Sequence, residues 1–74
     1  MEKLEKILND IKPGVDFKKE KKLITDNILT SFDIITLVAT LSSEYDITID
    51  VADIIPENFE SIELIQKLID SKQA

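Results

Sequence analysis

Three segments of this 74-residue chain carry apolar residues at the spacing of an α-helix, and this pattern limits the folds it can adopt. Residues three and four positions apart lie on one face of a helix, so each segment presents an apolar stripe that must be buried against another. The sequence shows no internal repeat. The three stripes consist of Leu4, Ile7, Leu8 and Ile11; of Ile34, Leu37, Val38, Leu41 and Tyr45; and of Ile62, Ile65, Leu68 and Ile69.

The first and last stripes are bounded by residues that begin or end helices. Pro13 and Gly14 follow the first stripe, and this pair predicts that a helix over residues 2–11 ends there. Ser61 precedes the last stripe and is a suitable N-cap, so we expect a helix that runs to about residue 71.

The middle stripe has the clearest start signal. Thr30 and Asp33 have the spacing of a capping box, in which each side chain accepts a hydrogen bond from the backbone of the other residue. This arrangement predicts a helix from Ser31 to Tyr45, with Ser31 as its first residue.

Two connections complete the predicted fold. Residues 15–30 hold a Lys-rich run at 18–22 in their first half, and their second half holds the apolar residues Leu23, Ile24, Ile28 and Leu29. This predicts a solvated stretch followed by a loop packed on the domain. Residues 47–49 alternate like a strand but are too few without a partner, and a short helix is expected over residues 51–55. The sequence thus predicts a single all-α domain over residues 1–74: a four-helix bundle with three longer helices, one short helix and a long loop between the first two.

Composition argues against catalysis and against metal binding. The chain has no His and no Cys, so the commonest general base and the thiolate ligands of metals are both missing. The segment that contains Asp46, Asp50 and Asp53 lacks the Gly-centred loop of a calcium-binding EF-hand. We therefore interpret these three residues as a solvated acidic surface. We therefore expect no catalytic residues, no metal site and no enzyme activity of the chain's own.

Charge also restricts the partners. The net charge is −6, and all nine basic residues are Lys, so the Arg contacts that read bases are absent. No apolar run reaches membrane-spanning length, and no leader opens the chain. These features predict a cytoplasmic protein that binds neither nucleic acid nor membrane and whose acidic residues face basic protein partners. We expect a monomer, because the apolar residues divide into one core and one small flank.

Ser31 is the candidate functional residue. The first N–H groups of a helix lack intrahelical acceptors and carry partial positive charge, so a phosphodiester attached there would be stabilised. Phe32, Ile35 and Ala39 form an apolar flank beside it, where a partner enzyme could bind. Serine at a helix start is, however, more often a structural residue, and the spacing by itself leaves both interpretations open.

The stretch from Leu23 to Lys72 resembles the acyl carrier protein family, whose four-helix domains carry phosphopantetheine. The segment Leu23–Asp33 is similar to the loop that enters the family's attachment serine, and Ser31 matches that serine. Leu37 and Leu41 match core positions of the following helix. The first helix fits the family more loosely.

The resemblance implies a carrier. A phosphopantetheinyl transferase would donate 4'-phosphopantetheine from coenzyme A to Ser31, and an acyl- or aminoacyl-activating ligase would load the arm for downstream transferases or synthases. The chain would then hold an acyl group as a thioester in bacterial fatty-acid or polyketide biosynthesis. The residues expected to dock partners are Phe32, Asp33, Ile35, Ala39, Asp50 and Asp53.

Departures from the family keep two alternatives open. Thr30 and Phe32 stand where the family usually has Asp and Leu, and the helix from Ser31 carries few of the carboxylates typical of fatty-acid carriers. Phe32, together with the long stretch from Asp50 to Glu60, resembles the D-alanyl carrier branch, so an aminoacyl or D-alanyl carrier is one alternative. The more distant alternative is an unmodified acidic helical module that binds a basic partner through this stretch.

Overall fold

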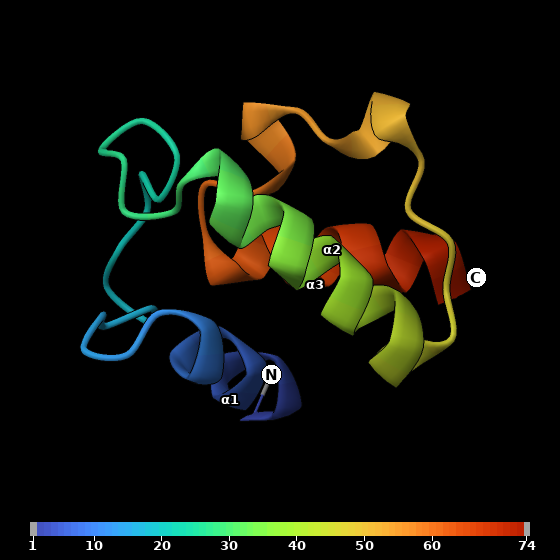
Figure 1. The fold of residues 1–74 in the computed structure, drawn as a ribbon, viewed down its shortest axis with the longest axis horizontal. Coiled ribbons are helices and arrows are strands. Elements are labelled where there is room, and N and C mark those ends of the chain that lie inside the picture. Colours follow the sequence, from blue (N-terminus) through green and yellow to red (C-terminus); the bar gives the residue numbers. More distant parts are fainter. Residues whose placement is uncertain (1, 74) are drawn as a thin grey trace.

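A computed structural model describes residues 2–73 of the chain and shows an all-helical fold (Figure 1). Helix α1 spans Glu2–Ile11, α2 spans Ser31–Tyr45 and α3 spans Ile62–Gln73. Two single-turn 3-10 helices, η1 at Val51–Asp53 and η2 at Pro56–Asn58, lie in the connection between α2 and α3. No strand is present within these residues. The all-helical prediction is confirmed, and so are the predicted limits of the first two helices.

Local signals explain the helix ends. Gly14, beyond the end of α1, adopts a φ of +88° that a side chain would strain. At the end of α2, Asp46 takes the left-handed conformation and its N–H donates to the Ser42 carbonyl oxygen. The Ser61 hydroxyl accepts a hydrogen bond of 3.2 Å from the Leu64 N–H, as expected of an N-cap for α3.

The predicted short helix over residues 51–55 is not confirmed as an α-helix, because only a single 3-10 turn over Val51–Asp53 is present. The 3-10 turn η1 ends at Asp53, and Ile55 is extended, with φ −123° and ψ 151°. Pro56 is the physical reason, because its ring disfavours helical conformation in the preceding residue and it lacks an N–H donor. The segment therefore consists of two separate turns, and the fold has three α-helices rather than four within the described residues.

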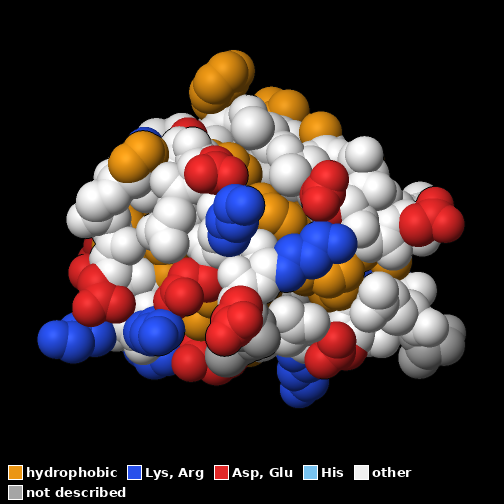
Figure 2. All heavy atoms as spheres, turned by 90° about the horizontal axis from the view of Figure 1, so that it is seen from below, with side chains coloured by type: hydrophobic (Ala, Val, Ile, Leu, Met, Phe, Trp, Pro, Cys, Tyr) orange, Lys and Arg blue, Asp and Glu red, His pale blue; other side chains and the backbone are white. Residues whose placement is uncertain are grey.

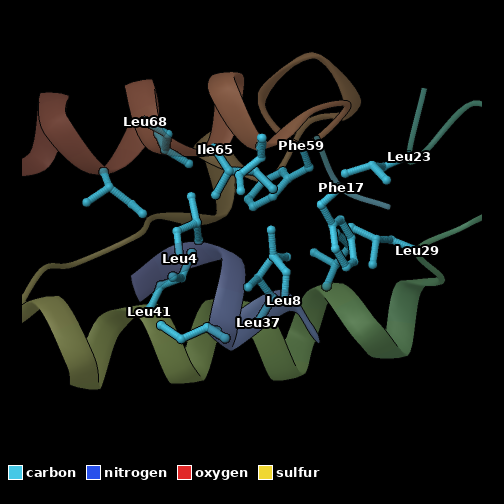
Figure 3. Packing of buried hydrophobic residues seen from close by; sticks show 14 of the residues in the cluster. Leu4, Leu8, Phe17, Leu23, Leu29, Leu37, Leu41, Phe59, Ile65 and Leu68 are labelled. Atoms are coloured by element: carbon cyan, nitrogen blue, oxygen red, sulfur yellow. The ribbon is translucent and has the colours of Figure 1, made fainter. Parts of the chain in front are cut away.

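The core lies where the three helices meet. Leu4 and Leu8 of α1 point into the space between α2 and α3, where Leu37, Leu41 and Ile65 close around them (Figure 3). The long loop supplies a further part of the core. Its side chains of Phe17, Leu23 and Leu29 are at most 2% exposed, and Phe59 joins them from the other connection.

The loop between α1 and α2 is thus packed on the domain, as its apolar residues predicted. Its Lys run is exposed at Lys18, Lys19, Lys21 and Lys22, although Lys21 pairs with Glu63 on α3 at 2.7 Å. Acidic and basic side chains are interspersed over the face seen from the α1 side (Figure 2). This face has no continuous patch of one sign.

Candidate functional site at the start of helix α2

Ser31 is the first residue of α2, and its side chain is exposed. The hydrogen bonds that cap the start of α2 do not involve the Ser31 side chain. The Thr30 hydroxyl accepts from the Asp33 N–H at 3.2 Å, and the Asp33 carboxylate accepts from the Thr30 N–H at 3.0 Å. The predicted capping box is therefore confirmed, and the Ser31 hydroxyl makes no hydrogen bond with residues 2–73. The helix does not need this hydroxyl as a cap, so it remains available for chemistry.

Asp33 is a structural residue of this site. It is only 9% exposed, and its carboxylate pairs at 2.9 Å with the ammonium group of Lys12, which follows α1. The hydrogen bond from the Thr30 N–H, followed by that from Lys12, lowers the pKa of Asp33 below its ordinary value. This burial does not fit the predicted partner-docking role of Asp33, because a partner would have to break the ion pair. The ammonium group of Lys12 also offsets the negative charge of Asp33, which lies two residues from Ser31.

Asp33→Asn should destabilise the fold near neutral pH by about 1–2 kcal/mol, because it weakens the cap and removes the charge that Lys12 binds. Since the pKa of Asp33 is lowered in the folded state, its contribution is present above the unfolded pKa and is lost as pH falls through the folded value. Urea denaturation of the wild type and of Asp33→Asn across the acidic range should therefore show that the difference between their free energies of unfolding shrinks toward low pH. Asp26→Asn is the matched control, because Asp26 is exposed and its carboxylate has no partner among the described residues. An unchanged difference across the acidic range would contradict the role of the charge.

The loop that leads into Ser31 is tied to the residue before the α3 cap. Glu60 accepts hydrogen bonds from the N–H groups of Ile24 and Thr25, each at 2.9 Å, and from the Thr25 hydroxyl. The Glu60 carbonyl oxygen also accepts from the Leu23 N–H at 2.9 Å. The hydrogen bonds to its carboxylate, that of the Thr25 hydroxyl first, lower the pKa of Glu60. This contact of Glu60 was not predicted, since no local pattern links residues so far apart in the chain.

A groove of about 250 Å³ lies beside Ser31. Its walls are almost entirely apolar and come from the loop, from α2 and from the η1–η2 segment. The contribution of that segment was not predicted from the sequence. The available signal was the apolar pair before Pro56, which is out of place in an acidic stretch. The residues that line the groove are Ile24, Ser31, Ile34, Ile35, Ile54, Ile55, Pro56 and Phe59.

The apolar flank of α2 is exposed, as expected. The side chains of Phe32 and Ile35 are 76% and 67% exposed, and Ala39 is exposed one turn further along. Ile35 belongs to the groove wall with Ser31, whereas Phe32 lies toward the α1 side of the helix. These three predicted docking residues are therefore accessible around Ser31.

The two acidic residues predicted to dock partners differ. Asp50 is exposed and lies 4.0 Å from the ammonium group of Lys72 on α3. Asp53 pairs with the same Lys72 at 2.6 Å and accepts from the Asp50 N–H, and its bond to Lys72 is the main cause of its lowered pKa. The Asp53 carboxylate is thus engaged within the chain, which does not fit a docking role.

Comparison with known proteins gives one curated relative. The chain is 36% identical over 56 residues to aminoacyl carrier protein 1 of Bradyrhizobium diazoefficiens, a match that covers 76% of this chain and 61% of that protein. No protein-family model and no solved structure matches. Within residues 2–73, no helix has the length and apolar character needed to cross a membrane. The similarity in sequence, together with the all-helical fold, identifies the chain as a relative of the phosphopantetheine-binding carrier proteins.

Proposed function

We propose that the chain is a carrier protein that holds its cargo as a thioester on a 4'-phosphopantetheine arm attached to Ser31. The observation that carries this proposal is the exposed Ser31 hydroxyl on the first turn of α2, beside a cap that Thr30 and Asp33 complete without it. In the attachment reaction the Ser31 oxygen attacks the β-phosphorus of coenzyme A and forms a phosphodiester. The pyrophosphate bond breaks, adenosine 3',5'-bisphosphate leaves, and the Ser31 proton passes to a base on the transferase.

The surroundings of Ser31 fit this group. The N-terminus of α2 favours a phosphodiester, and Lys12 neutralises the Asp33 carboxylate that would otherwise repel it. The apolar groove beside Ser31 offers a wall against which an arm or a small apolar cargo could lie. The arm supplies the thiol that the chain itself lacks, while partner enzymes perform the catalysis.

Within this function we favour an amino acid as the cargo over a fatty acid. The curated relative is named an aminoacyl carrier protein, and α2 carries only Asp33 and Glu44 as acidic residues. Asp33 is paired with Lys12, and Glu44 lies 3.8 Å from Lys3, so this helix offers little to a basic fatty-acid enzyme. Such a carrier works with a phosphopantetheinyl transferase, an aminoacyl-activating ligase and a downstream transferase, and we place it in the cytoplasm with them.

The experiment is the intact mass of the purified chain before and after incubation with coenzyme A, Mg²⁺ and a broad-specificity phosphopantetheinyl transferase. We expect a gain of one phosphopantetheine, which peptide fragmentation maps to Ser31. Aminoacyl-activating and fatty-acyl-activating ligases, each tested with its own substrates, then compare the two cargo classes on the modified chain. No mass gain on folded protein with several transferases would refute the carrier function and favour an unmodified interaction module.

A further inference from the structure

We propose that the enzymes acting on Ser31 bind this chain through an apolar, charge-neutral contact rather than through ion pairs, an inference that rests on the carrier function proposed above. The contact is the Ser31 surface, defined here as Phe32, Ile35, Ile54 and Ile55. These side chains are 76%, 67%, 40% and 41% exposed. Large apolar side chains gathered at this exposure mark an interaction site more often than ordinary packing.

The position of Ser31 determines what covers this surface. Ser31, Ile35, Ile54 and Ile55 line one groove, and Phe32 follows Ser31 directly on the first turn of α2. An enzyme that brings its catalytic groups to the Ser31 hydroxyl must therefore lie against Ile35, Ile54 and Ile55, with Phe32 at the edge of this surface on the α1 side. The part of the enzyme that covers the Ser31 surface is the apolar rim of its active site.

Three carboxylates near the surface are engaged within the chain. Asp33 is paired with Lys12 at 2.9 Å and Asp53 with Lys72 at 2.6 Å, while Glu60 accepts three hydrogen bonds from the long loop. A basic partner would have to break these contacts before it gained any of its own. The net charge of −6 thus overstates the charge available at the site.

Among the acidic residues of the η1–η2 segment, Asp50 and Glu57 are the exposed ones. Glu57 lies in η2, next to the Pro56 that lines the groove, and its carboxylate has no partner among the described residues. It is therefore the sharpest test of the opposite hypothesis, in which ion pairs hold the partner.

The test measures the rate of phosphopantetheine transfer from coenzyme A to the full chain by a broad-specificity transferase, with mass spectrometry as the readout. Between about 50 mM and about 500 mM NaCl, which screens exposed ion pairs, the KM for the chain should stay within about twofold. Ile35→Ala should raise KM about tenfold with little change in kcat, as truncation of a central apolar contact does. The matched control is Leu64→Ala on α3, because Leu64 is 37% exposed and does not line the Ser31 groove, and it should leave KM unchanged.

Each other outcome overturns the inference in a distinct way. If KM rises more than about tenfold with salt, ion pairs hold the partner. The same conclusion would follow if Glu57→Gln raised KM more than about tenfold. Concentration-dependent dimerisation that Ile35→Ala abolishes would assign the surface to a second copy of the chain. In both cases the chain is still modified, so the carrier function stands. Absence of any modification would instead refute the carrier function itself.

Discussion

Ser31→Ala should abolish phosphopantetheine transfer to the chain while the fold survives. The phosphodiester forms at the Ser31 oxygen, so no weaker reaction can replace it once that oxygen is removed. The fold should change little because Thr30 and Asp33 cap α2 and the Ser31 hydroxyl has no partner within residues 2–73. We expect a cost of at most about 1 kcal/mol in the free energy of unfolding. Intact mass after incubation with coenzyme A and a transferase, together with urea denaturation, measures both quantities.

The matched control for this variant is Ser43→Ala. Ser43 lies on the same helix and is also exposed, but it is far from the first turn. This control should gain one phosphopantetheine at the wild-type rate. Modification of the Ser31→Ala chain at another residue would show that the attachment site has been assigned wrongly.

Leu37→Ala should have the largest effect on stability. Leu37 is fully buried on α2 and lies among core residues from α1 and α3 (Figure 3). Truncation of a buried Leu removes apolar contacts and leaves a cavity, which costs about 2–5 kcal/mol. A domain of this length has only about 4–11 kcal/mol of stability in total, so the variant should be close to unfolding.

Urea denaturation followed by circular dichroism measures this loss. Leu64→Ala serves as the control, since the same side chain is truncated at an exposed position on α3 and should cost well under 1 kcal/mol. A loss below about 1 kcal/mol for Leu37→Ala would contradict the packing of α1, α2 and α3 around this residue.

The candidate site depends on three contacts between parts of the chain that are distant in sequence. Lys12 neutralises Asp33, Glu60 binds the loop that leads into Ser31, and Lys72 binds Asp53 in the segment that forms part of the groove wall. In each contact a carboxylate is used to join segments rather than to meet a partner. The acidic composition of the chain is therefore partly a feature of its folding.

The sequence by itself determined the helices and the start of the site. The bounds of α1 and α2, the capping box of Thr30 and Asp33, and the place of Ser31 as the first residue of α2 were all predicted. These features depend on residues within one or two turns of each other, where apolar spacing and capping act directly. The resemblance to carrier proteins, which the curated relative supports, rested on the longer stretch from Leu23 to Lys72.

Only the tertiary structure decided what surrounds Ser31. Lys12 and Lys72 reach Asp33 and Asp53 across the fold, so the expected docking roles of these two carboxylates stay predictions, and Glu60 binds the loop that leads into Ser31. The groove likewise needs Ile24, Ile35 and Ile54 to be brought together from three segments. The expected helix over residues 51–55 was lost for a local reason, Pro56, whereas these contacts follow from how the three helices pack. Spacing along the chain carries no record of that packing, so it could place Ser31 at the start of α2 but could not predict the surroundings of this residue.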